Sequence, residues 1–304
     1  MNAVTKAHLA LLGTNLFFAL NYSAIKYFTN NHIAGPFGIN ILRVGGSMLL
    51  FWLLFPFKPN KKVFKLKDIK RLLLCAFTAI AANQMLFIKG LQYTSPLHAS
   101  LLTLLSPILI TLLASYMLKE RLSILKVGGL LFALSGALLL LSGKETNPGD
   151  NFLLGDSLII ASSVAYTFYF ILVKPLMDDY SPMMVTRMIF SFGFIMILPL
   201  CVQEVRAINF KDFSPSEWLS MFYVVVPGTF LAYVFNVYGI KILNASKAGA
   251  YIYTQPVFAG AAAAFFLGEK ITLPRIIAAL MIFAGLYMAQ RKQKKLNSIP
   301  SAEN

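Results

Sequence analysis

Residues 106–140 read SPILITLLASYMLKERLSILKVGGLLFALSGALLL, and residues 255–289 read QPVFAGAAAAFFLGEKITLPRIIAALMIFAGLYMA. In both stretches a proline opens an apolar run that closes on a glutamate with a base behind it, and a second apolar run with a glycine follows. One constant shift in residue number, the shift that carries Pro107 onto Pro256, maps the first stretch onto the second without a gap. The chain therefore repeats one structural unit, and we call this displacement the repeat shift.

The repeat extends beyond the quoted stretches. Between residues 90 and 136 the repeat shift gives identical pairs at Gly90/Gly239, Ala99/Ala248, Pro107/Pro256, Leu118/Leu267, Glu120/Glu269, Leu131/Leu280 and Gly136/Gly285. Because Leu and Ala match easily in such a composition, the argument depends on the proline, the glutamate and the basic pair Lys126/Arg275. With small gaps the earlier segments also align, at Lys26/Lys174, Pro36/Pro182 and Arg43/Arg187.

The composition is that of a membrane protein. Apolar residues make up 58% of the 304 residues, charged residues only 13%, and the mean hydropathy is +0.69, whereas soluble domains carry about 25% charged residues. Apolar runs recur along the chain, and about 20 residues of helix cross a hydrocarbon core of about 30 Å. The predicted fold class is all-α integral membrane.

Reading these runs as helices gives ten transmembrane spans. We place them at about residues 8–29, 36–56, 70–90, 96–118, 123–142, 154–174, 182–202, 216–239, 246–267 and 274–290. Two domains of five helices follow, residues 8–142 and residues 154–290. Because an odd number of spans separates the copies, the second enters the membrane from the opposite side. The ten transmembrane helices then form two inverted five-helix repeats, an architecture typical of alternating-access carriers.

The net charge of +15 is distributed beside the spans. The densest basic run, KPNKKVFKLKDIKR at residues 58–71, links two spans, so we expect the lipid bilayer and no nucleic acid as a partner. With the N-terminus inside, eighteen Lys and Arg residues lie on the inner side, six on the outer side and three within spans. Because basic residues concentrate in cytoplasmic links, we predict a multi-pass protein of the cytoplasmic membrane with both termini in the cytoplasm.

The pattern resembles that of the drug/metabolite transporter superfamily, specifically EamA-type carriers with two EamA domains. It consists of a lysine that ends the first span, a proline and an arginine in the second, a proline and a closing glutamate in the fourth, and a glycine in the fifth. The residues that match are Lys26, Pro36, Arg43, Pro107, Glu120 and Gly136, and then Lys174, Pro182, Arg187, Pro256, Glu269 and Gly285. The resemblance implies transport of small solutes, commonly export of amino acids or other metabolites, through a central cavity.

Polar and aromatic residues inside the spans are the candidate binding residues. Amide side chains in hydrocarbon need partners, so they either form hydrogen bonds between helices or line a water-filled path. For these residues as a set we favour the water-filled path. The resemblance places the first, third, fourth, sixth, eighth and ninth spans around the cavity. The predicted substrate-binding residues are Asn21, Tyr22, Asn83, Gln84, His98, Tyr166, Tyr169, Tyr233, Asn236, Tyr253 and Gln255.

A second group of candidate residues is expected to act in gating or as functional charges. It consists of Lys26, Arg43, Pro107, Glu120, Pro256 and Glu269. Cations inside spans are functional candidates, although Lys26 and Arg43 could instead snorkel to the headgroups. The glutamates either bind a proton or the substrate, or they are interfacial charges that cap a neighbouring helix or pair with a base. The two prolines are expected to kink their spans.

The remaining motifs exclude several classes of protein. The stretch GALLLLSGKE at residues 136–145 has neither the spacing nor the Ser/Thr of a phosphate loop, and Cys75 and Cys201 lie in apolar runs. We therefore expect no cofactor, no metal and no enzymatic activity. The sequence predicts a secondary transporter that exports small metabolites, with amino acids as first candidates, by alternating access, as a monomer or homodimer. The alternative is an integral-membrane enzyme acting on lipid-linked substrates, for which Asp178–Asp179 is the available acidic pair.

Overall fold

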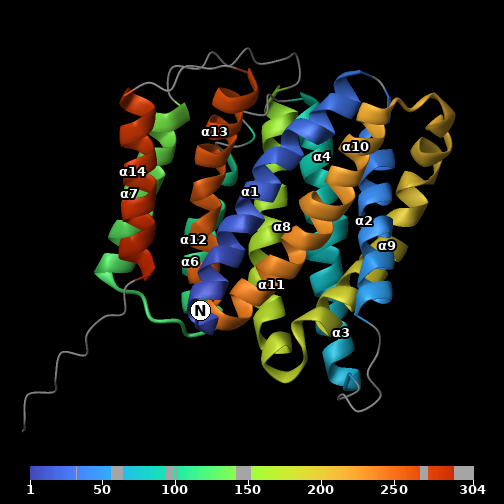
Figure 1. Ribbon diagram of the computed structural model, residues 1–304. Coiled ribbons are helices and arrows are strands. Elements are labelled where there is room, and N and C mark those ends of the chain that lie inside the picture. Colours follow the sequence, from blue (N-terminus) through green and yellow to red (C-terminus); the bar gives the residue numbers. More distant parts are fainter. Residues whose placement is uncertain are drawn as a thin grey trace, which may run out of the picture.

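Helices form the regular structure of the chain (Figure 1). The computed structural model describes residues 1–31, 33–55, 64–93, 99, 102–141, 152–267 and 273–290, and these residues contain no strand. The first half contains α1 (Ala3–Asn30), α2 (Pro36–Leu54), α3 (Leu66–Ala76), the π-helix η1 (Phe77–Ala82), α4 (Asn83–Tyr93), α6 (Ser106–Met117) and α7 (Ile124–Leu141). The second half contains α8 (Phe152–Asp179), α9 (Pro182–Arg206), η2 (Phe210–Asp212), α10 (Pro215–Val225), the π-helix η3 (Val226–Leu231), α11 (Ala232–Leu243), α12 (Ala245–Ala250), η4 (Tyr251–Thr254), α13 (Gln255–Leu267) and α14 (Leu273–Gln290).

In the part of the chain that the structure describes, the regular structure is helical throughout, and several segments are long enough to cross a bilayer. Six helical segments are long and apolar enough by length and composition: Ala3–Thr29, Pro36–Leu54, Leu66–Tyr93, Leu153–Asp179, Pro182–Arg206 and Pro215–Leu243. Three shorter apolar helices accompany them, Ser106–Met117, Ile124–Leu139 and Ile276–Gln290.

Capping residues and prolines set where helices begin. Pro36, Pro182 and Pro215 each open a helix, the position at which the missing N–H of proline costs nothing. Before two of these prolines stand Ser181 and Ser214, whose side chains accept hydrogen bonds from backbone N–H groups of the first turn. The predicted span starts at these three prolines therefore have a local chemical cause.

Helices of the two halves begin and end at matching positions. α1 and α8 both contain 28 residues, α7 and α14 both contain 18, and within each pair the repeat shift carries the first start onto the second. The same shift carries the π-helix η1, which interrupts α3–α4, onto the π-helix η3, which interrupts α10–α11. α2 and α9 are the exception, because their starts are separated by a slightly shorter stretch of chain. The shift that the sequence shows between residues 90 and 136 thus extends over most of the described chain.

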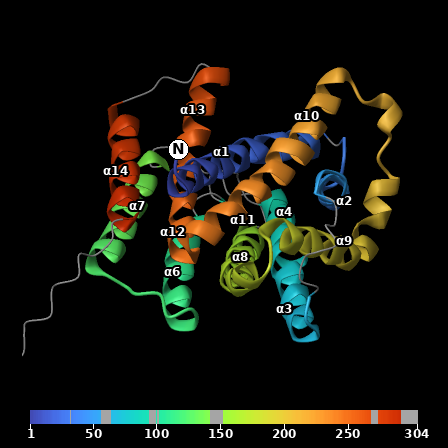
Figure 2. The ribbon, with the colours of Figure 1, turned by 60° about the horizontal axis from the view of Figure 1, so that its bottom comes forward.

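Matching helices run in opposite directions, and each packs on a helix of the other half. In Figure 1, α1 begins at the lower end of the molecule whereas α8 begins at the upper end, and α7 rises where α14 descends. α1 packs on α11 and α4 on α8, while α2 lies beside α9 and α7 beside α14. The α7–α14 pair stands at one edge of the bundle in both views (Figure 2).

Glycines bring α7 and α14 into backbone contact. A Cβ atom added at Gly129 would lie 2.6 Å from the carbonyl oxygen of Gly285, and one added at Gly136 would lie 2.8 Å from that of Ala278. The repeat shift converts the first of these contacts into the second. Close approach at small residues is the usual way that helices associate in lipid.

Large apolar side chains also cover the outside of the bundle. Leu53, Ile195 and Leu280 are each more than 60% exposed. Lipid tails solvate exposed apolar side chains of this kind, and soluble monomers keep their exposed apolar patches small. The core is correspondingly less distinct from the surface than in a soluble protein, which removes the usual signal for the inward face of each helix.

Candidate functional site

One cavity lies where the two halves meet. The empty space inside it, including the part that is open to solvent, is about 700 Å³. Its walls come from α1, α2, α4, the start of α6, α8, η3, α11, η4 and α13, through Phe18, Asn21, Tyr22, Ile25, Arg43, Asn83, Gln84, Phe87, Thr103, Ser106, Ser162, Ser163, Tyr166, Gly228, Thr229, Tyr233, Ile252 and Gln255.

Most of the predicted binding residues surround this cavity. Seven of the eleven line it: Asn21, Tyr22, Asn83, Gln84, Tyr166, Tyr233 and Gln255. Asn236 lies behind the wall, and its Nδ2 donates to the hydroxyl oxygen of Tyr166 at 2.8 Å. His98 lies outside the described residues. Contact between these residues and a substrate stays a prediction. Because most of them line the same cavity, the prediction now refers to a defined site.

Two predicted residues lie away from the cavity. Tyr169 and Tyr253 are fully buried, and neither hydroxyl has a hydrogen-bond partner among the residues that the structure describes. The Tyr169 ring stacks on Tyr166, with 5.9 Å between centroids, on the side that faces the apolar core. Because a helix turns about 100° per residue, residues three apart on α8 point in directions that differ by about 60°. That rotation is enough to separate a lining residue from a core residue.

Polar side chains across the cavity connect helices of the two halves. Gln84 Nε2 of α4 donates to the Tyr233 hydroxyl oxygen of α11 at 3.0 Å. The repeat shift carries Gln84 onto Tyr233, so the bond joins matching positions of the two halves. On α1, the Tyr22 hydroxyl donates to Gln255 Oε1 of α13 at 3.2 Å, and Gln255 Nε2 donates to Asn15 Oδ1 at 2.8 Å.

Two further amides bond to backbone carbonyls of the opposite half. Asn83 Nδ2 donates to the carbonyl oxygen of Ser162 at 3.0 Å, and Asn21 Nδ2 donates to that of Gly228 at 3.2 Å. Gly228 belongs to η3, and π-helical turns are frequent at functional sites. The amides therefore bond helix to helix and line the cavity at once, so the two roles considered from the sequence coexist in the same residues.

Arg43 is the charged residue among the cavity-lining residues. Its Nε donates to Asn40 Oδ1 one turn earlier on α2, at 2.9 Å, and Asn40 Nδ2 contacts Met85 Sδ at 3.2 Å. Arg43 thus points into the cavity and does not snorkel outward. For Lys26, the other predicted cation, the described structure includes the helix backbone but not the side chain.

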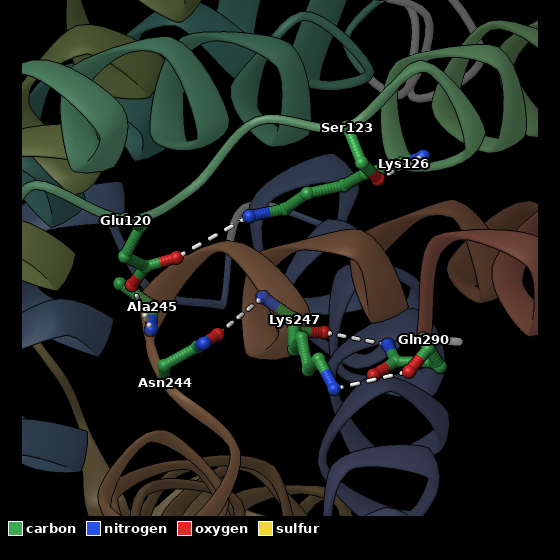
Figure 3. Close-up of polar contacts among 7 residues, drawn as sticks. All are labelled: Glu120, Ser123, Lys126, Asn244, Ala245, Lys247 and Gln290. Atoms are coloured by element: carbon green, nitrogen blue, oxygen red, sulfur yellow. Dashed lines mark hydrogen bonds and ion pairs between the residues drawn. The ribbon is translucent and has the colours of Figure 1, made fainter. Parts of the chain in front are cut away.

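Glu120 lies on the link between α6 and α7, at the end of the molecule where α1 begins (Figure 1), and its contacts join the two halves (Figure 3). Its Oε2 lies 3.4 Å from Lys126 Nζ, and its Oε1 accepts a hydrogen bond of 3.2 Å from the backbone N–H of Ala245, the first residue of α12. The carboxylate therefore pairs with a base and caps a neighbouring helix, the contacts of an interfacial charge. The matching Glu269 lies outside the described residues.

A second set of hydrogen bonds at the same end connects α12 to α14 (Figure 3). Lys247 Nζ donates to the carbonyl oxygen of Gln290, and Gln290 Nε2 donates to the carbonyl oxygen of Lys247, both at 3.0 Å. The N-cap of α12 is Asn244, which has a positive φ of 80° and accepts a hydrogen bond from the Lys247 N–H. Contacts from the α6–α7 link and from α14 thus converge on α12 at this end of the bundle.

Pro107 and Pro256 lie at the beginnings of helices rather than within them. Pro107 is the second residue of α6 and follows a turn at Leu104–Leu105, and Pro256 is the second residue of α13 and follows the 3₁₀-helix η4. The expected kink is thus a break in the helix before each proline. A proline tolerates this position because its N–H would be unpaired there in any case.

Sequence reasoning missed several cavity residues. Ser162 and Ser163 are adjacent hydroxyls in the middle of an apolar span, a signal that could have been used. Gly228 and Thr229 follow Pro227 within a span, which indicates an irregular turn and freed carbonyls. Phe18 has no distinguishing signal, because 26 phenylalanines occur in the chain.

Comparison with known proteins gives a family match across the chain. The profile of the EamA-like transporter family matches residues 5–142 and again residues 153–290. A crystal structure of a protein 18% identical to this chain superposes with a TM-score of 0.73, over 94% of this chain and 97% of that one. At that identity the superposition shows the fold alone.

Similar sequences come from bacteria, archaea and plants. The uncharacterized transporter YetK of Bacillus subtilis is 25% identical over 84% of this chain and 78% of its own length. An uncharacterized transporter of Archaeoglobus fulgidus is 25% identical over 95% of this chain and its whole length. A WAT1-related chloroplastic protein of Arabidopsis thaliana is 24% identical over 84% of this chain and 63% of its own length.

Proposed function

This chain belongs to the EamA-like transporter family, and from that premise we propose that it is a secondary transporter that exports small metabolites by alternating access. Amino acids are the first candidate substrates. One observation carries the proposal: polar and aromatic residues from both halves line a common cavity, in a chain with six helical segments long and apolar enough to cross a membrane. Binding sites at the interface of two repeats are the usual arrangement in secondary carriers.

We propose further that ten helices cross the membrane as two inverted five-helix repeats. Three features support this: the repeat shift that relates the matching helices other than α2 and α9, the opposite directions of matching helices, and the α7–α14 glycine contacts that the shift exchanges. The Gln84–Tyr233 bond between matching positions lies where the axis relating two such repeats would pass. Rocking of one repeat against the other around the cavity would open it to each side of the membrane in turn.

The contacts of Glu120 supply a gate in this scheme. The carboxylate reaches from the α6–α7 link to α12 across the boundary between the halves, at the end where α1 begins. For the cavity to open at that end, the bond to Ala245 must break. These interactions of Glu120 break easily, because an ion pair near the surface and a charge at a helix end each contribute only about 1 kcal/mol.

We place this end in the cytoplasm and the protein in the cytoplasmic membrane. Lys126 and Lys247 lie there together with the start of α1 and the end of α14. Basic residues at one membrane face favour the cytoplasmic side. Monomers and homodimers are both compatible with this arrangement.

Flux into proteoliposomes tests the proposed function. Vesicles loaded with an unlabelled amino acid should accumulate the labelled form transiently by counterflow, and vesicles without protein should not. A panel of amino acids, nucleosides and sugars identifies the substrate class. If no solute in the panel shows counterflow while protein-containing vesicles remain sealed, the transporter proposal fails.

The rival function is an integral-membrane enzyme acting on lipid-linked substrates. Its acidic pair would be Asp178–Asp179, but Asp178 Oδ1 accepts a bond of 2.7 Å from Lys174 Nζ, one turn earlier on α8, and does not line the cavity. That contact favours a solvated helix end. Product formation from a lipid-linked substrate without solute flux would support the enzyme instead.

A further inference from the structure

We propose that the transported molecule carries a single carboxylate and that the guanidinium of Arg43 binds it. The inference rests on the proposed transport function, because it takes the cavity as the substrate site. It adds the charge of the substrate and the residue that selects it.

The electrostatic environment of Arg43 calls for an anion. Among the residues that the structure describes, no acidic side chain lines the cavity. The ion pairs recorded in the described part of the chain, Lys126–Glu120 and Lys174–Asp178, do not include Arg43. An unpaired charge inside a membrane costs several kcal/mol. A bound anion would remove that cost, so substrate binding and charge compensation become the same event.

The geometry of the side chain leaves its binding face available. Nε is engaged by Asn40 Oδ1, which fixes the orientation of the planar group. The two terminal nitrogens make no recorded hydrogen bond to the described residues and are not among the buried unpartnered atoms, although Arg43 as a whole is only 9% exposed. A carboxylate fits such a fork with two parallel N–H···O bonds. The guanidinium is therefore oriented before a ligand arrives.

Charge balance favours one negative charge rather than two. Arg43 alone offers a positive charge to the cavity among its described lining residues. A carboxylate neutralises that charge, whereas a doubly ionised phosphate would leave an uncompensated negative charge in a site of low dielectric. The single cation thus selects carboxylates over phosphomonoesters.

The other residues that line the cavity indicate the chemical character of the rest of the transported molecule. Aromatic rings of Phe18, Tyr22, Phe87, Tyr166 and Tyr233 form much of the wall, and the Tyr22 and Phe87 rings lie 5.1 Å apart between centroids. Such walls suit an apolar or aromatic group. A molecule with a carboxylate and an apolar or aromatic body would use both features of the cavity, the guanidinium and the aromatic wall.

Matched ligand pairs test the inference on the purified full-length protein. Binding of 3-phenylpropionate and L-phenylalanine is measured by equilibrium dialysis and compared with that of 3-phenylpropanamide, L-phenylalaninamide and phenyl phosphate. Each carboxylate should bind at least about tenfold more tightly than its amide, and phenyl phosphate should bind more weakly than 3-phenylpropionate at a pH above its second pKa. If neither carboxylate binds, or if an amide or the phosphate binds equally well, the inference is overturned.

Variants assign the preference to Arg43. Arg43→Gln should reduce carboxylate affinity at least about tenfold and bring carboxylate and amide to the same affinity, while Arg43→Lys should retain part of the preference. Arg187→Gln, which replaces the arginine of the corresponding helix α9, should leave it intact. A preference that survives Arg43→Gln overturns the assignment. Counterflow of a neutral or cationic solute that is insensitive to Arg43→Gln would uphold the transporter and overturn this inference, so the two failures are distinct.

Discussion

Arg43 and Arg187 belong to the corresponding helices α2 and α9, as the eighth and the sixth residue, and have opposite environments. Arg187 of α9 donates from Nη1 to the carbonyl oxygen of Phe55 at 2.8 Å, and its Cζ lies 4.3 Å from the centroid of the Trp52 ring. Both partners belong to the first half, at the end of α2. Arg43 of α2 lines the cavity, and its recorded hydrogen bond is to its own helix. One arginine joins the halves, and the other faces the space between them.

The difference teaches that a repeated fold need not have a repeated site. Helix bounds and the α7–α14 glycine contacts follow the repeat shift. α2 and α9 do not follow it, since their starts at Pro36 and Pro182 lie closer together in the chain than the shift requires, and they carry the two arginines. Asymmetry is therefore concentrated in one helix pair, where, among the described lining residues, one half alone supplies a charge to the cavity.

The largest expected effect is on transport after replacement of Arg43. Arg43→Gln should reduce the initial counterflow rate of a carboxylate substrate about 30-fold or more, since removing one partner of a buried charge pair costs at least about 2 kcal/mol. The melting temperature should stay the same or rise, because the variant removes an unpaired buried cation. A fall in melting temperature parallel to the loss of transport would make Arg43 a structural residue like Arg187.

Replacement of Arg187 should show the converse. Arg187→Gln loses a charged hydrogen bond and a cation–π contact, so the free energy of unfolding should fall by about 2–3 kcal/mol. Thermal unfolding in detergent measures this, and counterflow per folded molecule should be unchanged. A double-mutant cycle with Trp52→Leu isolates the ring contact. Coupling near zero, with stability unaffected, would contradict the contrast between the two arginines.

The symmetric part of the molecule can be tested with neighbouring glycines. At Gly129→Ala the new Cβ would meet backbone atoms of Gly285 and Ala289 at 2.6–2.7 Å, whereas at Gly128 nothing lies within 4 Å. Overpacking should lower the free energy of unfolding by about 1–3 kcal/mol in Gly129→Ala, and Gly128→Ala should be neutral or slightly stabilising. Gly136→Ala, at the contact related by the shift, should resemble Gly129→Ala. Equal effects at Gly128 and Gly129 would show that the α7–α14 contact does not hold the repeat together.

The sequence predicts the helices far better than the directions in which their side chains point. Proline, serine and the paired glutamates mark where elements start and end, and the repeat allows each half to check the other. A membrane helix, however, is apolar on its lipid face and on its core face, so the periodic signal that orients a soluble helix is weak. Tyr166 and Tyr169 were therefore indistinguishable, although one lines the cavity and the other is buried.

Polar residues were the useful guide because each must find a partner in hydrocarbon. That requirement places Asn21, Asn83 and Gln84 at contacts between halves, and the cavity lies among those contacts. No such rule applies to Phe18 or Ile252, which line the cavity only because their helices bring them there. Irregular backbone was a missed signal, since Pro227 within a span indicates the turn that presents Gly228 and Thr229.

The smallest expected effect concerns Glu120, whose contacts close the end of the bundle where α1 begins. Glu120→Gln keeps an oxygen that can accept from the Ala245 N–H but loses the ion pair with Lys126 and the negative charge at the start of α12. The free-energy difference between the closed and open states of this end should shift by about 1 kcal/mol, which is about fivefold in population. A cysteine at Ser246, in a background without Cys75 and Cys201, should react with a maleimide about fivefold faster in the variant, because Ser246 is buried in the closed arrangement. The control is Glu217→Gln, which removes a carboxylate that caps only its own helix α10; equal acceleration by both variants would mean that Glu120 stabilises the fold in general and does not gate this end.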